Sequence, residues 1–255
     1  MFHFLLRHIP RPILIKVSLL FRHIAPIVYY GNRFEDPISG RTYRKFLPYG
    51  YSGKAKRKNA LCPGSLSLER HRLLWLYLKN KSDFFTKNKI KLLHIAPEQC
   101  FYQLFKKQTN LEYITADMNS PIADVKMDLH HTPFQDNEFD VIFCNHVLEH
   151  VDDDRQCMRE LYRIMKSGGW GIFQVPQDIN RETTYEDKSI VTEADREIHF
   201  WQKDHVRLYG LDYPKRLQEA GFTVTTIDYT KELSAELVEK YRLPVGELLY
   251  VCFKH

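Results

Sequence analysis

Short apolar runs alternate with helix-like segments from residue 90 to the end of the chain. The runs cover residues 90–96, 113–116, 139–144, 171–175, 222–227 and 248–253. Helical patterns lie between them at about 100–108, 152–166 and 212–220. Runs without alternation are typical of strands buried on both faces, and their alternation with helices indicates a parallel sheet covered on both sides. We therefore expect an α/β fold with a Rossmann-like, doubly wound, mostly parallel sheet.

The pattern before residue 66 is different. Short strand and turn signals occur at 29–32, 38–40 and 48–53, and a leucine-rich helix is predicted to begin after Ser67 as its N-cap. We expect two parts: a basic N-terminal extension over 1–65 and a larger domain over 66–255. Cys62-Pro63-Gly64 resembles half of a zinc knuckle, but Cys62 stands alone and a zinc ribbon needs about four ligands. No structural zinc is predicted there.

Positive charge is concentrated at the start of the chain. Residues 1–90 hold 18 Lys/Arg and four Asp/Glu, whereas the whole chain has a net charge of +5, so the remainder is acidic. This asymmetry indicates contact with a membrane surface, a nucleic acid or a phosphorylated substrate, unless it is a solvated basic face. Residues 1–28 mix basic residues with apolar clusters too short to span a bilayer, which fits a segment lying on an anionic membrane or packing on its own domain.

The cysteine content and the N-terminus bear on the compartment. Five scattered cysteines argue against a disulfide framework and for a reducing environment. The first residues lack a continuous apolar stretch followed by a small-residue cleavage site. We expect a cytoplasmic protein, with peripheral contact to the inner face of the membrane as a further hypothesis.

Polar residues follow the apolar runs, where parallel sheets bind their ligands. His94 ends the first run, and Glu98 comes shortly after it. Asp117 ends the second strand, nineteen positions beyond Glu98, where a carboxylate can accept two hydrogen bonds from a ribose diol. Asp128, eleven positions further on, suits the amino group of an adenine. The alternative for Asp128 is a turn residue before His130.

A later stretch carries a specific resemblance. Phe139-Asp140-Val141-Ile142 is followed by Leu148-Glu149-His150, a helix, and Lys166 before Gly168-Gly169. In this order and spacing, over roughly residues 66–254, the chain resembles a class I S-adenosylmethionine-dependent methyltransferase of the type 11 group. The resemblance implies a seven-stranded sheet with an antiparallel last strand. It also implies S-adenosylmethionine as the cofactor and transfer of its methyl group to a nucleophile.

The first loop departs from the family pattern. His94 holds the position of an acidic residue, and Ala96, Pro97 and Glu98 replace glycines. Glu98 could still meet the amino group of the cofactor, and Ala96 is small enough for close approach. The departure leaves open a degenerate domain that binds a ligand without turnover. The cofactor-binding residues that the resemblance implies are His94, Ala96, Pro97, Glu98, Asp117, Met118, Asp128, Leu129, Asn145 and His146.

Two further groups concern the acceptor and a metal. His146-x-x-Glu149-His150 matches a metalloprotease signature, but it directly follows a buried-strand pattern, so we predict hydrogen-bonded roles and no metal ion. Residues 177–210 form a polar insert that borders the acceptor site in this fold. We expect Gln177, Arg207 and Tyr209 to contact the acceptor there. His205 is the candidate general base, His146 a second catalytic candidate, and a lid that packs on itself is the alternative.

The leading hypothesis is therefore a methyltransferase acting on a small molecule, such as a saccharide or a lipid-linked intermediate. An RNA methyltransferase is the second hypothesis, because the basic first third suits phosphates. Nucleic acid is the less favoured partner, since a dense aromatic and basic patch is missing. The third hypothesis is the non-enzymatic ligand-binding domain. The acceptor atom and the oligomeric state are not predicted by this sequence.

Overall fold

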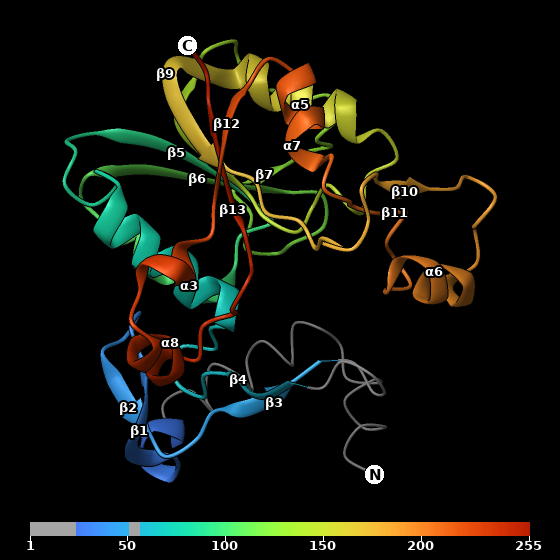
Figure 1. Ribbon diagram of the computed structural model, residues 1–255. Coiled ribbons are helices and arrows are strands. Elements are labelled where there is room, and N and C mark those ends of the chain that lie inside the picture. Colours follow the sequence, from blue (N-terminus) through green and yellow to red (C-terminus); the bar gives the residue numbers. More distant parts are fainter. Residues whose placement is uncertain (1–23, 51–56) are drawn as a thin grey trace. The chain divides into compact units, whose positions relative to one another are not determined.

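A computed structural model describes residues 24–50 and 57–255 of the chain. The chain divides into two compact units, one made of residues 1–85 with 228–247 and the other of 86–227 with 248–255 (Figure 1). The division that we expected after residue 65 therefore falls inside the first unit. A separate extension over residues 1–65 stays a prediction. Residues 1–23, which include most of the proposed amphipathic segment, lie outside the described residues.

The described residues of the first unit include two small antiparallel ribbons and several helical segments, among them a short helix at 24–28. β1 pairs with β2, and β3 pairs with β4. Phe34, Tyr43, Phe46 and Cys62 form a buried apolar cluster beside these ribbons, and burial raises the pKa of the Cys62 thiol to about 11. The other elements of this unit are β1 (Tyr30–Asp36), β2 (Arg41–Tyr43), β3 (Leu47–Tyr49), β4 (Arg57–Leu61), α3 (Glu69–Lys81), η1 (Tyr229–Glu232) and α8 (Ala235–Tyr241).

The signal at 38–40 is a turn between β1 and β2, closed by Gly40 N–H donating to the Asp36 carbonyl. One local prediction in this unit is wrong. The N-cap of α3 is Leu68 rather than Ser67. The Ser67 hydroxyl instead donates to the buried Asp36 carboxylate (3.2 Å), so it joins the start of the helix to β1.

The second unit is built on one seven-stranded sheet. Its strand order is β12-β13-β9-β8-β5-β6-β7, and β13 is antiparallel to both of its neighbours. This confirms the Rossmann-like fold class and the antiparallel last strand. The strands are β5 (Ile90–Ile95), β6 (Leu111–Asp117), β7 (Val125–Lys126), β8 (Phe139–Cys144), β9 (Met165–Ile172), β12 (Thr223–Ile227) and β13 (Leu249–Phe253).

Helices and one insert complete the second unit. The helices are α4 (Gln99–Phe105), α5 (Asp154–Ile164) and α7 (Tyr213–Glu219). α5 and α7 lie side by side beside the sheet, and Cys157, Met158 and Leu161 of α5 are buried in its core (Figure 1). The insert between β9 and α7 holds β10 (Tyr185–Glu186), α6 (Glu193–Phe200) and β11 (Arg207–Leu208).

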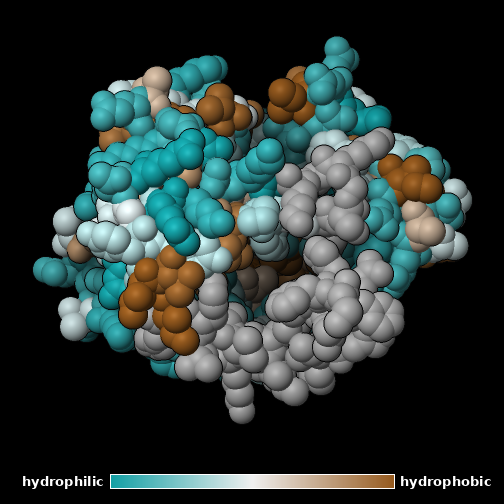
Figure 2. Space-filling view, turned by 90° about the horizontal axis from the view of Figure 1, so that it is seen from below, coloured by the Kyte–Doolittle hydropathy of each residue, from teal (hydrophilic) through white to brown (hydrophobic). Residues whose placement is uncertain are grey.

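Some large hydrophobic side chains are exposed on the surface of the described residues. Large exposed hydrophobic side chains include Ile179, Val191 and Ile198 of the insert. Figure 2 shows a mostly hydrophilic face on which hydrophobic residues form separate patches. Within residues 24–50 and 57–255, no helix combines the length and the apolar character needed to cross a bilayer. All five cysteines are buried and free of disulfides.

A charged network fixes α5 to the loop before β8. The Glu160 carboxylate accepts hydrogen bonds from Thr132 N–H (3.0 Å) and from the Arg163 guanidinium (2.8 Å). The hydrogen bond from Arg163 is the main reason that the pKa of Glu160 falls to about 2. A carboxylate with a lowered pKa stabilises the fold above its unfolded pKa, and this contribution is lost as the pH falls through the folded value.

Glu160→Gln is therefore expected to lower the free energy of unfolding at pH 7 by about 2 kcal/mol. The difference from wild type should shrink as the pH falls from about 4.5 towards about 2, measured by urea unfolding across this range. Glu219→Gln is the matched control, because Glu219 pairs with Arg155 where both side chains are nearly half exposed, and such pairs contribute little. A difference that does not depend on pH would contradict this explanation.

Candidate functional site

The carboxyl end of β5 carries a buried histidine paired with a carboxylate. β5 lies between β6 and β8, so the ends of three parallel strands meet there. His94 is fully buried, and its Nδ1 lies 2.9 Å from the Tyr113 hydroxyl of β6. Its Nε2 is in contact with the Glu98 carboxylate. The carboxylate missing from the strand end is therefore supplied four residues later, at the N-cap of α4.

The loop from His94 to Glu98 turns sharply although it contains no glycine, and the backbone of Ala96 makes this turn possible. Ala96 has φ +49°, a left-handed conformation that glycine adopts freely and other residues rarely. Its N–H donates to the Ala116 carbonyl (2.9 Å), which holds the turn against β6. Alanine has the smallest side chain among the residues that carry a Cβ atom. Ala96 therefore keeps the tight path of a glycine-rich loop.

Asn145, directly after β8, connects Glu98 with Gln174, which follows β9. Its Nδ2 donates to Glu98 Oε1 (3.2 Å), and its Oδ1 accepts from Gln174 N–H (3.3 Å). His146 follows with φ +56°, and its N–H donates to the Gln174 carbonyl (2.7 Å). The structure thus brings together His94, Glu98 and Asn145, three residues predicted as cofactor contacts.

Asp117 ends β6 and shapes the turn after it. Its Oδ1 accepts from the N–H groups of Asn119 and Ser120, at 2.6 Å each. Its Oδ2 has no hydrogen-bond partner among the described residues, so one carboxylate oxygen is available to a ligand. The neighbouring Met118 side chain is exposed, as a residue that covers a bound ring would be.

Asp128 forms the turn that we considered as the alternative. Its Oδ1 accepts from His130 N–H (2.9 Å) and lies 2.7 Å from His130 Nδ1. The backbone hydrogen bond from His130 is the main reason that the pKa of Asp128 is lowered. Leu129 is buried in the core of the sheet. Asp128 is exposed and ionised, and its contact with a ligand stays a prediction.

The side chains of Arg207 and Tyr209 in the insert are buried and form hydrogen bonds with other groups of the protein. Arg207 is almost fully buried, and its guanidinium donates to the carbonyls of Leu148 (2.7 Å), Val151 (2.5 Å) and Asp152 (2.9 Å). The buried Tyr209 hydroxyl donates to Asp154 Oδ2 (2.8 Å). The structure gives both residues a different set of partners from the acceptor that we expected. They hold the loop after β8 in place.

Gln177 is partly buried at the start of the insert. Its Nε2 donates to the Gly210 carbonyl (2.7 Å), and its Oε1 accepts from the Tyr250 hydroxyl (2.5 Å). These bonds connect both ends of the insert to β13. A contact between Gln177 and an acceptor stays a prediction.

A second polar cluster lies between the loop after β8 and the insert. The Glu149 side chain is 1% exposed, and its Oε1 lies 3.5 Å from His146 Nδ1 and 3.9 Å from His150 Nε2. Burial opposes the ionisation of Glu149, but the neighbouring His146 and His150 together outweigh it and lower the pKa of the carboxyl. Burial lowers the pKa of His205, whose ring packs at a right angle on that of His150 (84°). His205 is therefore a neutral, enclosed histidine.

Sequence reasoning did not single out Tyr113 and Gln174 as site residues. Both follow from position, since Tyr113 lies in β6 beside His94, and Gln174 comes just after β9. Their partners could be found only from the sheet register, which pairs β5 with β6 and β8 with β9.

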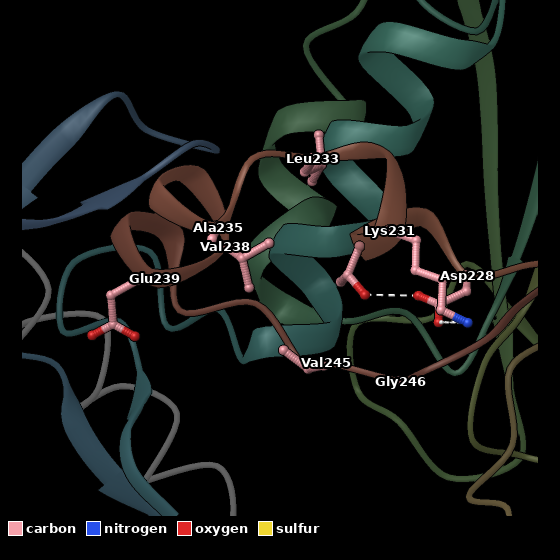
Figure 3. Close-up of a pocket in the computed structure, with 9 residues that line it drawn as sticks. Asp228, Lys231, Leu233, Ala235, Val238, Glu239, Val245 and Gly246 are labelled. Carbon is pink, nitrogen blue, oxygen red and sulfur yellow. Dashed lines mark hydrogen bonds and ion pairs between the residues drawn. The ribbon is translucent and has the colours of Figure 1, made fainter.

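A separate hollow lies within the first unit. It has a volume of about 540 Å³ and lies between η1, α8 and residues 245–246 (Figure 3). Val238 and Leu233 contribute apolar walls, and Lys231 pairs with Asp228 (3.2 Å) at one side. None of the predicted site residues lines this hollow.

The sequence profile of a family described as "Methyltransferase domain" matches residues 89–173, which run from β5 into the segment after β9. This match covers the His94, Glu98, Asp117 and Asn145 positions, and the strand order agrees with it. The second unit contains a class I methyltransferase domain. Its methyl donor is S-adenosylmethionine, and the protein is a methyltransferase.

Solved structures resemble this domain at low sequence identity. A SAM-dependent methyltransferase from Archaeoglobus fulgidus is 16% identical, with a TM-score of 0.48 over 74% of this chain and 95% of the other. The YcgJ protein of Bacillus subtilis is 16% identical (TM-score 0.45, 72% and 99% covered). Phosphoethanolamine N-methyltransferase 2 of Haemonchus contortus, solved with S-adenosyl-L-methionine, is 13% identical (TM-score 0.47, 72% and 52% covered). No curated protein matches the sequence.

The residues of the methyltransferase domain fit the donor. Asp117 offers an oxygen without a partner at the end of β6, as a ribose contact requires. Glu98 places a carboxylate beside the narrow Ala96 turn, as an ammonium contact requires. Both oxygens of Glu98 already have partners in this chain, so an incoming ammonium group has to share them with His94 and Asn145.

Proposed function

We propose that this methyltransferase acts on a small molecule and that its donor lies across the carboxyl ends of β6, β5 and β8. Asp117 would hold the ribose hydroxyls, Asp128 the adenine amino group, and Glu98 the amino group of the methionine part. The observation that supports this arrangement is the His94–Glu98–Asn145 network, which places a carboxylate at the end of the central strand despite the missing acid.

The donor supplies an activated methyl group on a sulfonium, so the protein has mainly to align the acceptor. Asn145 and His146 follow β8, where we assign them to the sulfonium end and the entrance for the acceptor. The left-handed backbone of His146 turns the chain sharply at that point. We do not propose His205 as the general base, because its side chain is enclosed and only 1% exposed.

The test begins with calorimetric titration of S-adenosylmethionine and S-adenosylhomocysteine. Glu98→Gln is expected to weaken binding of both by about tenfold, since it replaces a charged hydrogen-bond acceptor by a neutral one. Glu112→Gln is the matched control, because the Glu112 side chain is exposed on β6 and forms an ion pair with Lys91 (3.4 Å). Equal binding by wild type and folded Glu98→Gln would contradict the proposed role.

Transfer of a labelled methyl group to a panel of hydroxyl, amine and carboxyl acceptors then tests the substrate class. Transfer to small acceptors, without transfer to RNA, is the expected result. Turnover on RNA alone would overturn the small-molecule assignment, and donor binding without turnover on either would favour a degenerate domain.

We also propose a cytoplasmic location with membrane contact through residues 1–28. Cell fractionation of the protein with and without that segment tests this proposal.

A further inference from the structure

Three potential metal ligands converge from two distant segments of the chain. Glu149 and His150 lie in the loop between β8 and α5, whereas His205 lies in the insert between α6 and β11. One ligand atom from each residue lies within 4.8 Å of the other two. The Val206 N–H donates to the Glu149 carbonyl (2.9 Å), so the backbone also holds the two segments together.

The hydrogen bonds of the two imidazoles determine which nitrogen faces the cluster. His205 Nδ1 lies 2.9 Å from the Phe200 carbonyl, and His150 Nδ1 lies 3.1 Å from the Asp204 carbonyl. A carbonyl only accepts, so each Nδ1 must carry the proton. An unprotonated Nε2 in either ring is then an acceptor with a free lone pair. Metal-bound histidines are oriented by backbone carbonyls in the same way.

Two of these acceptors are buried without a hydrogen-bond partner in the described part of the chain, and the third belongs to the partly exposed His150. His205 Nε2 and Glu149 Oε2 are buried, and neither has a hydrogen-bond partner among the described residues. His150 Nε2 lies 3.9 Å from Glu149 Oε1. Buried polar atoms without partners are costly, and acceptors turned towards one another are more so. A single cation at the centre would satisfy all three.

We propose that Glu149, His150 and His205 bind one divalent transition-metal ion of the zinc type. Two imidazoles and one carboxylate suit zinc, whereas calcium and magnesium prefer oxygen ligands alone. Three protein ligands leave one coordination position for water. Bond lengths of about 2.0–2.2 Å require ligand atoms roughly 3.4 Å apart, so small side-chain rotations close the site.

This site differs from the metalloprotease signature in the sequence. That motif would use His146 and His150 from one helical face, but residues 146–150 are not helical, and α5 begins only at Asp154. His146 instead lies beside Glu149 and orients its carboxylate. The third ligand comes from the insert, 55 residues beyond His150. The ion would fasten the insert to the loop that follows β8.

The test uses the full-length protein without a histidine tag, stripped by a chelator and then dialysed. Titration with Zn²⁺, together with the visible absorption of bound Co²⁺, is expected to give one tight site per chain. His205→Ala and Glu149→Gln should each weaken binding by at least about 100-fold. His199→Ala in α6 is the matched control, because that histidine is exposed and pairs with Tyr185 (3.2 Å).

For variants that fold poorly, the thermal unfolding midpoint provides a second test of metal binding. Zn²⁺ is expected to raise the unfolding midpoint of wild type and of His199→Ala, since a ligand that binds the folded state stabilises it. His205→Gln should show no such increase. Absence of a tight site in folded wild type, or equal loss of binding in His199→Ala, would overturn the proposal. Titration of S-adenosylhomocysteine into the same samples keeps this result separate from the proposed function.

Discussion

Replacing Asp117 by alanine is expected to weaken the binding of S-adenosylhomocysteine by about 100-fold. The change removes the proposed hydrogen bonds from ribose hydroxyls to a carboxylate, which together contribute about 3 kcal/mol. It also removes the oxygen that holds the N–H groups of Asn119 and Ser120, so the turn after β6 loses its shape. Isothermal titration measures the effect directly.

Two variants separate these contributions. Asp117→Asn keeps an oxygen for the turn but loses the charge, so we expect a loss of about tenfold. Asp187→Ala removes a turn aspartate of the same kind, which accepts from Ser189 N–H (2.8 Å) in the insert, and should leave binding unchanged. Folded Asp117→Ala that binds within threefold of wild type would remove Asp117 from the site.

Replacing Arg207 by alanine is expected to destabilise the protein by about 3–5 kcal/mol, because removal of one partner leaves buried charges and carbonyls unpaired. The guanidinium serves three backbone carbonyls and the Glu186 carboxylate (3.1 Å). In a protein of this size the unfolding midpoint should fall by roughly 10 °C. Urea and thermal unfolding measure both quantities.

Arg181→Ala is the control for this experiment. Arg181 lies in the same insert, but its side chain is 43% exposed, and its ion pair with Asp178 is long at 3.8 Å. We expect a change within about 0.5 kcal/mol there. If Arg207→Ala were as stable as wild type and had lost methyl transfer, the contact with the acceptor expected from the sequence would be supported instead.

The strands and the order of the methyltransferase elements could be predicted because buried parallel strands are continuous apolar runs. β8 agrees with its predicted bounds, and β5 differs by one residue. The bounds of β9 could not be predicted, since the strand begins at Met165 and includes Gly168 and Gly169, which are typical of turns.

The position of Asp117 at the end of β6 was predictable, because it depends only on where one strand ends. The roles of other residues were not predictable where they depend on partners. Arg207 and Tyr209 are polar residues in a polar insert, and no local pattern indicates that both are buried against the loop after β8. The pairing of His94 with Glu98 likewise depends on the turn at Ala96, which takes a conformation that alanine seldom adopts.

The path of the chain through its two compact units has a consequence for biosynthesis. β12 and β13 are neighbours in the sheet, yet residues 228–247 between them belong to the first unit, where Arg72 donates to the carbonyls of Tyr241 and Arg242. The N-terminal unit therefore cannot complete its contacts until nearly the whole chain has left the ribosome. Until then the Arg72 guanidinium lacks two of its backbone acceptors. A fragment ending at residue 85 would lack α8 for the same reason, so this unit is not separable by a single cut.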